Sequence, residues 1–169
     1  MNTLRETEWA YLAGLIDGEG CLFISKQQFK QCVYPSYRAH LIVGMTNKSV
    51  IDYIHSLVDA GNVYFTKSKS EKYMHKYRWE VTANVDISKI LNNILPFLIV
   101  KKAEAETMLD FVSSDFTFKK GPGRSRPISI VKAQDGFYRR LMDLKTSGKG
   151  PDFTPIEPIE QVDLQTILF

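Results

Sequence analysis

The pattern of apolar and polar residues divides this chain into short segments with either helical or strand periodicity. Residues 36–46 alternate, with Ala39 and Leu41 on the apolar side, which is the period of a strand that buries one face. The periodicity of apolar residues predicts strands at residues 21–28, 36–46, 63–67 and 74–82. It predicts helices at residues 6–17, 48–60, 86–95, 100–113 and 128–145.

Residues with known end preferences set the expected limits of these elements. Thr7 and Asp86 are candidate N-caps, because short polar side chains accept hydrogen bonds from the first free amides of a helix. Gly18 and Gly20 are expected to end the first helix, and Gly61 the second.

Two hairpins that are each followed by a helix predict an α+β fold in the order α-β-β-α-β-β-α. We expect one antiparallel sheet with helices on one face and a polar, basic opposite face. The chain is interpreted as a single domain, residues 1–169, with its core at residues 5–115. Residues 116–169 are expected to form a C-terminal helical region and an extended, acidic, proline-containing tail.

Composition narrows the class of protein. The chain has 169 residues, 44% hydrophobic and 24% charged, which excludes wholesale disorder. It has no run of eighteen apolar residues and no basic-then-apolar leader, so we expect an intracellular protein that is neither secreted nor membrane-bound. Cys21 and Cys32 form no C-x-x-C pair, which argues against a disulfide scaffold or a cysteine zinc site.

The net charge of +3 is unevenly distributed. Residues 150–169 hold four acids and no Lys or Arg, so this tail carries −4 and the remainder +7. Residues 66–79 concentrate the positive charge against Glu71 alone: Lys67, Lys69, Lys72, Lys76 and Arg78. Such a run is either a solvated hairpin or a phosphate-facing surface.

The most informative segment is residues 9–20, WAYLAGLIDGEG. Ala10, Gly14 and Gly18 are four residues apart and line one face of a helix, where another backbone can come close. A mid-helix glycine costs up to about 1 kcal/mol relative to alanine, which indicates a packing requirement. Asp17 and Glu19 lie near the helix C-terminus, where acids are unfavourable unless a cation binds.

Residues 12–20, LAGLIDGEG, resemble the signature of the LAGLIDADG homing endonucleases, and the likeness extends over residues 5–115. The length resembles that of the single-motif, homodimeric class. The resemblance implies the homing endonuclease fold and a site-specific double-strand DNA endonuclease, intron-encoded, that hydrolyses phosphodiester bonds in a long pseudopalindromic target. It also implies a divalent metal, Mg²⁺ or another such as Mn²⁺.

The resemblance implies roles for particular residues. Glu19 would bind the metal, with the Gly18 carbonyl as a further ligand. Asn47 would order solvent near the scissile phosphate and Lys101 would support its charge, with Lys102 or Lys48 as alternatives to Lys101. The dimer interface implied by the motif helix consists of Ala10, Ala13, Gly14 and Asp17.

The resemblance also places the outward faces of the strands in the DNA major groove. A strand of residues 36–46 is about 36 Å long at roughly 3.3 Å per residue. That length covers some ten base pairs at roughly 3.4 Å each. The candidate DNA-binding residues are Ser25, Gln27, Arg38, His40, Thr66, Lys67, Ser68, Lys69, Lys72, Lys76, Arg78 and Glu80.

Two other functions share this expected fold. One is a maturase that binds intron RNA and assists splicing without cutting DNA. The other is a DNA-binding regulator with no catalytic activity, which would not need Glu19. The basic loop at residues 119–127 is either a DNA backbone contact or a linker.

Overall fold

The computed structural model describes residues 4–70, 72–116 and 126–146. The helices are α1 (Glu6–Glu19), α2 (Lys48–Val58), α3 (Asn84–Ile94), α4 (Lys102–Ser113) and α5 (Ile128–Thr146), with a 3₁₀ turn, η1 (Leu95–Phe97). The strands are β1 (Gly20–Gln27), β2 (Ser36–Met45), β3 (Asn62–Thr66) and β4 (Lys76–Val81). The predicted α+β order is confirmed.

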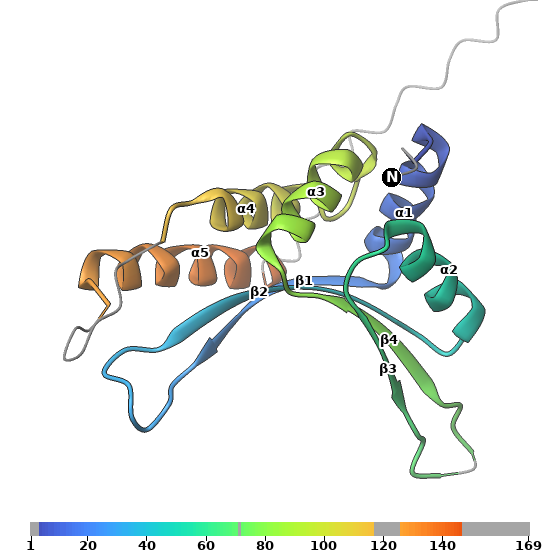
Figure 1. The fold of residues 1–169 in the computed structure, drawn as a ribbon, viewed down its shortest axis with the longest axis horizontal. Helices are drawn as coiled ribbons and strands as arrows, with labels where there is room; N and C mark the ends of the chain where they lie inside the picture. Colours follow the sequence, from blue (N-terminus) through green and yellow to red (C-terminus); the bar gives the residue numbers. More distant parts are fainter. Residues whose placement is uncertain (1–3, 71, 117–125, 147–169) are drawn as a thin grey trace, which may run out of the picture.

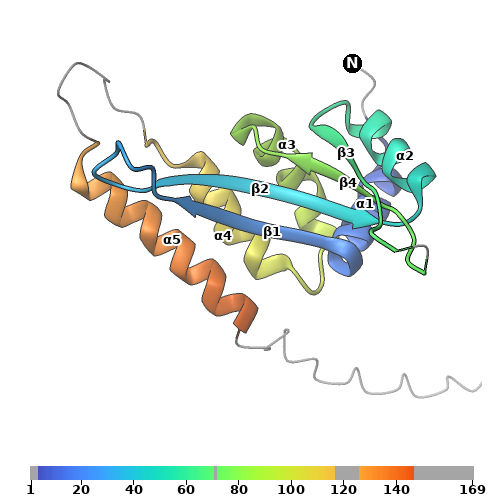
Figure 2. The ribbon, with the colours of Figure 1, turned by 90° about the horizontal axis from the view of Figure 1, so that it is seen from below.

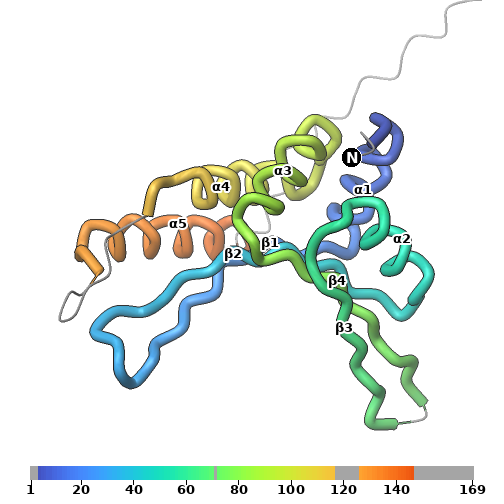
Figure 3. The backbone as a smooth tube through the Cα atoms, viewed as in Figure 1, coloured from blue at the N-terminus to red at the C-terminus, as the bar shows by residue number. Residues whose placement is uncertain are grey.

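The strands form one antiparallel sheet in the order β1-β2-β4-β3. Figure 1 shows that the helices cover one side of this sheet, while the β1–β2 and β3–β4 hairpins reach down at opposite ends. The tube in Figure 3 follows the same two hairpins as they splay apart and give the sheet an arched profile. Seen from below in Figure 2, the strands cross the open side with no helix over them.

Side-chain alternation explains which face is covered. In β2, Ala39, Leu41 and Val43 are fully buried beneath the helices, whereas Arg38 and Gly44 are exposed on the other side. The helices supply matching apolar faces from residues that are fully buried: Leu12, Ile16, Ile51, Ile54, Ile87, Ile90 and Leu91. Burial of this apolar surface stabilises the sheet–helix contact.

The predicted helix ends need correction. Helix α1 has Arg5 as its N-cap, because Glu8 accepts a 2.7 Å hydrogen bond from the Arg5 amide, and Thr7 lies inside the helix. The prediction for Asp86 was also wrong, since α3 is capped at Ala83. Helix α2 ends at Asp59 in the left-handed conformation, φ 52°, before Gly61.

The turn from α1 into β1 depends on Gly20. Helix α1 continues through Gly18 and ends at Glu19, so the prediction that Gly18 breaks it was wrong. A Cβ on Gly20 would lie 2.5 Å from the Ile16 carbonyl oxygen, which cannot yield because it is backbone. Gly20 therefore permits the chain to leave α1 directly into β1, with Glu19 held at the junction.

Helix α5 is fastened to the β1–β2 hairpin by one carboxylate. Asp135 accepts hydrogen bonds from the Tyr37 hydroxyl at 2.6 Å, Lys26 Nζ at 2.7 Å and Arg139 Nε at 2.8 Å. These donors, first Lys26 and then Tyr37, hold the pKa of the Asp135 carboxyl well below its usual range. Burial in turn raises the pKa of the Tyr37 hydroxyl.

Within the described residues, no helix has the length and apolar character needed to cross a membrane. The acidic tail at residues 150–169, and all but the last two residues of the basic loop at 119–127, lie outside the described part of the chain.

Candidate active site and nucleic-acid interface

Glu19 is the last residue of α1, and its side chain is exposed. Its carboxylate forms no hydrogen bond or ion pair with any residue in the described part of the chain. An unpaired acid at a helix C-terminus is repelled by the partial negative charge of the free carbonyls. The position is therefore suited to a cation bound between carboxylate and carbonyl oxygens.

Asp17 braces the chain internally. Its carboxylate accepts hydrogen bonds from the amides of Ile99 at 2.7 Å, Val100 at 3.2 Å and Lys101 at 2.9 Å. These contacts fix the turn before α4 against the end of α1. The bonds agree with the bracing role expected for Asp17, and its place beside a dimer interface stays a prediction.

The brace brings Lys101 to the end of α1. The Lys101 ammonium donates to the main-chain carbonyl oxygen of Asp17, two residues before Glu19. The turn that carries Lys101 thus meets the end of α1 that carries Glu19, although the two are far apart in the chain. Of the alternatives to Lys101, Lys48 is paired with Asp52 and Lys102 is exposed.

Asn47 has a structural role that the sequence did not predict. Its side-chain oxygen accepts from the amides of Ser49 at 3.0 Å and Val50 at 3.4 Å, which makes it the N-cap of α2. The oxygen is therefore occupied, and only the side-chain NH₂ group remains to order solvent.

Sequence reasoning missed Glu104 on α4. Burial raises the pKa of its carboxyl, while the positive charges of Lys145 and Lys101 act in the opposite direction. Its only sequence signal is a position three residues after Lys101, which is too common a spacing to single it out.

The small-residue face of α1 is open in the single chain. A Cβ added to Gly14 or Gly18 would meet nothing within 4 Å, and neighbouring Tyr11 is 46% exposed. Ala10 is half-buried on the same helix. Ala13 is fully buried in the core of its own chain, so its predicted place in an interface was wrong.

The open face of the sheet holds a connected polar network. Glu80 accepts from His40 Nδ1 at 2.7 Å and forms an ion pair with Arg78 Nη2 at 3.1 Å. His40 Nε2 lies 3.0 Å from the Ser25 hydroxyl. The Arg78 guanidinium lies over the Tyr64 ring, 4.9 Å from its centroid. These contacts run across all four strands and hold Arg78 and His40 in place on the two central ones, β4 and β2.

One aromatic residue of β1 lies on this face. Phe23 points to the open side and stacks on His40 with a centroid distance of 4.6 Å. Two aromatic residues of β4, Tyr77 and Trp79, belong to the covered side, and Trp79 is fully buried.

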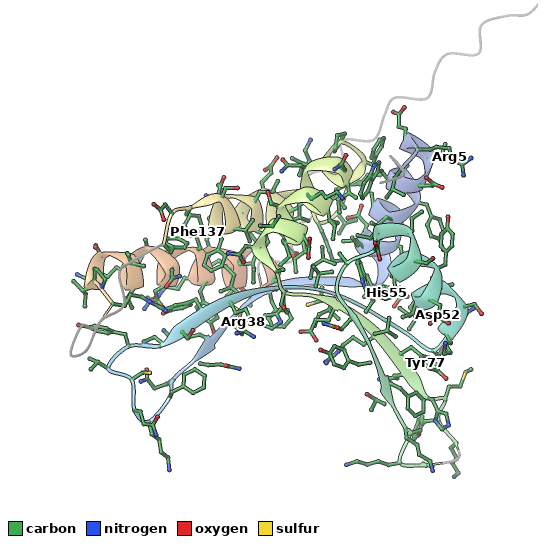
Figure 4. The ribbon with its side chains drawn as sticks, in the orientation of Figure 1. Arg5, Arg38, Asp52, His55, Tyr77 and Phe137 are labelled. Carbon is green, nitrogen blue, oxygen red and sulfur yellow. The ribbon has the colours of Figure 1, made fainter. Side chains whose placement is uncertain are left out.

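The remaining predicted DNA-binding residues fall into two groups. Gln27, Arg38, Thr66 and Lys76 have exposed side chains along the strands; Figure 4 labels Arg38 on the open side of the sheet and Phe137 among the helices on the other side. The second group lines an open hollow at the tip of the β3–β4 hairpin: Lys67, Ser68, Lys69 and Lys72, with Tyr73 and His75.

The donors at the end of α1 fit a hard divalent cation only in part. Glu19 offers a carboxylate and Gly18 a main-chain carbonyl, which are the oxygen ligands that Mg²⁺ prefers. In the described part of the chain, no group of three or more His, Cys, Asp or Glu side chains gathers to hold a metal. The Glu19 carboxylate and the Gly18 carbonyl thus supply only two of the six or more oxygen ligands that such a cation takes.

These features define a class of protein: an α+β fold with an arched antiparallel sheet, and a motif helix that delivers an acid to the sheet's edge. The family model for LAGLIDADG endonucleases matches residues 12–114. The chain therefore belongs to the LAGLIDADG endonuclease family. A search of the curated proteins found no match to the sequence.

Solved structures of homing endonucleases share the fold. I-CvuI, in complex with the I-CreI target in the presence of 2 mM Mg with the DNA not cleaved, has 21% identity and a TM-score of 0.66, over 86% of each chain. Archaeal intron-encoded I-Vdi141I, complexed with DNA, has 17% identity and a TM-score of 0.67, over 96% of this chain and 93% of that one. I-TnaI has 11% identity and a TM-score of 0.61, over 86% and 97%.

Proposed function

We propose that this protein is a homodimeric, divalent-metal-dependent endonuclease that cuts both strands of a long double-stranded DNA site, as an intron-encoded homing enzyme does. The observation that carries the proposal is the exposed, unpaired carboxylate of Glu19 at the end of α1, two residues after the Asp17 carbonyl that holds the Lys101 ammonium, at the edge of an open polar sheet. Similar proteins have been solved with DNA, and one of them in the presence of Mg.

Hydrolysis of a phosphodiester bond would use only a few groups from each chain. Glu19 and the Gly18 carbonyl would hold the metal, most simply Mg²⁺, which when bound activates the attacking water and stabilises charge on the phosphate. Lys101 supplies a fixed positive charge, since its ammonium is already held against the end of α1. Asp17 keeps that ammonium in place by fixing the turn before α4.

A second copy would complete the site. The small-residue face of α1, with empty space over Gly14 and Gly18, allows the same helix of another chain to approach closely. A two-fold arrangement would place the two Glu19 carboxylates near one axis. Each chain would then contribute its own sheet to one half of a pseudopalindromic site.

The open sheet provides the DNA-binding surface. Arg78 and Arg38 offer guanidinium groups that suit bidentate contacts to guanine in the major groove. Lys67, Lys69 and Lys72 at the hairpin tip suit contacts to backbone phosphates. Because Arg78 is already held by Glu80 and Tyr64, it loses little side-chain entropy on binding.

The test is cleavage of a plasmid library that carries randomised inserts, with purified protein and Mg²⁺. The expected result is linearisation of a subset with a shared sequence, lost on chelation of the metal. Glu19→Gln should bind the selected DNA without cutting it, while Glu6→Gln, an acid at the other end of α1, should cut normally. Cutting by Glu19→Gln at the wild-type rate would refute the assignment.

A further inference from the structure

A lysine outside the matched family region lies at the open face of the sheet, beside β1. Lys145 belongs to the last turn of α5. Its ammonium is 3.4 Å from the Cys21 sulfur and 5.8 Å from the centroid of the Phe23 ring. Cys21 and Phe23 alternate along β1 with the buried Leu22 and Ile24, so Lys145 reaches the open face.

The contacts place Lys145 beside the candidate active site. Cys21 is two residues after Glu19, at the start of β1. Independently, Glu104 on α4 experiences the charges of both Lys145 and Lys101. The two ammonium groups thus approach the same region from different helices.

None of the groups around Lys145 neutralises its charge. A thiol and an aromatic ring interact weakly with an ammonium, and the half-buried Glu104 acts on it only at longer range. No Asp or Glu oxygen lies within 4 Å of Lys145 Nζ in the ranges 4–70, 72–116 and 126–146. A lysine in the last turn of a helix is favourable in itself, but that effect requires no particular direction of the side chain.

The position of α5 is well determined relative to β1. Asp135 lies about three helical turns before Lys145. Its carboxylate accepts hydrogen bonds from Lys26 and Tyr37 of the β1–β2 hairpin. Val131 and Leu141 are buried on the same helix. Lys145 is therefore carried on a helix fastened to the sheet, and Figure 2 shows α5 running alongside β1.

We propose that Lys145 binds a backbone phosphate of the DNA next to the phosphate that is cut. This inference rests on the proposed function, because it assumes that the open face binds duplex DNA. An ammonium is a compact charge that needs no fixed geometry to bind a phosphate oxygen. The C-terminal helix would then be part of the DNA-binding surface as well as a support for β1.

The test is the salt dependence of binding to a labelled 30-base-pair duplex of mixed sequence, without divalent metal. Losing one phosphate contact lowers the slope of log affinity against log salt by about 0.9. The affinity ratio of wild type to Lys145→Ala should therefore fall about 3.5-fold per lost contact between 50 and 200 mM salt. Lys145→Arg should keep the wild-type slope, and all variants should have the wild-type melting temperature.

The matched control is Lys89→Ala, which removes the same charge from an exposed position on α3, in the helical layer. It should leave the slope unchanged. Equal slopes for Lys145→Ala and Lys89→Ala, with a wild type that binds duplex, would overturn this inference alone. A wild type that binds no duplex would overturn the proposed function along with it.

Discussion

Replacing Asp17 tests the contact between the end of α1 and the turn before α4, on which the candidate site depends. Its carboxylate accepts three backbone amides, from Ile99, Val100 and Lys101, at 2.7, 3.2 and 2.9 Å. In Asp17→Ala these amides lose their acceptor, and the turn before α4 is no longer tied to the end of α1. Lys101, which donates to the Asp17 carbonyl, would then lose its fixed position.

The size of the expected loss in unfolding free energy depends on how exposed these hydrogen bonds are to solvent. A hydrogen bond to a charged group contributes about 1.5–3 kcal/mol, and loss of a helix cap costs about 0.5–2 kcal/mol. Two of the three bonds are exposed, where water replaces the lost acceptor, so the sum is well below three full contributions. We expect Asp17→Ala to lower the free energy of unfolding by about 2–4 kcal/mol.

The assay is urea unfolding followed by circular dichroism, read as a change in midpoint at constant m-value. Asp17→Asn keeps one carbonyl oxygen and should be intermediate. The control is Asp110→Ala, an exposed acid on α4, which should change stability by less than about 0.5 kcal/mol. An Asp17→Ala variant as stable as Asp110→Ala would refute the reasoning.

Three further predictions follow from other parts of the structure. Gly14→Leu should fold normally, because Gly14 is exposed and a Cβ there meets nothing within 4 Å in the single chain, yet sedimentation should show a monomer; a dimer of wild-type affinity would refute the proposed interface. Asp135→Asn should be less stable than wild type at pH 7, and the difference in urea midpoint should shrink as pH falls below about 4. The difference shrinks in this direction because the pKa of Asp135 is lower in the folded protein than in the unfolded chain. The ionised carboxylate therefore stabilises the fold at pH values above the unfolded-state pKa, and this stabilisation is lost as the folded protein takes up the proton at lower pH. A constant difference down to pH 2 would contradict this reasoning. Glu80→Ala should broaden the base preference of selected sites, since Arg78 and His40 lose their shared acceptor, and an unchanged preference would show that the network does not position them.

The sequence predicted the helices and strands that are specified by the local pattern of apolar and polar residues. Alternation in residues 36–46 placed Ala39 and Leu41 under the helices and Arg38 outside, and the burial agrees. The predicted caps at Thr7 and Asp86 failed because other local contacts decide the helix starts. At α1 the Arg5–Glu8 pair does so without a short polar cap.

The site itself was predictable only in part. The motif and the resemblance singled out Glu19 and Lys101 as candidates, but they did not predict the contact between the end of α1 and the turn before α4. The carboxylate of Asp17 bonds to amides 82 to 84 residues away, a distance that no local pattern encodes. The same holds for Lys145 and Cys21, which are 124 residues apart and meet only because α5 lies along β1.

The proposed function depends above all on Glu19 as part of a metal-dependent DNA-cutting site. The most direct measurement compares wild type and Glu19→Gln on DNA selected from a randomised library, with binding and cleavage measured on the same sample. Wild type should cleave both strands with Mg²⁺, Glu19→Gln should cleave neither, and both proteins should bind the duplex. Tight binding of intron RNA with no cleavage of any DNA, or undiminished cutting by Glu19→Gln, would refute the assignment of Glu19 to such a site.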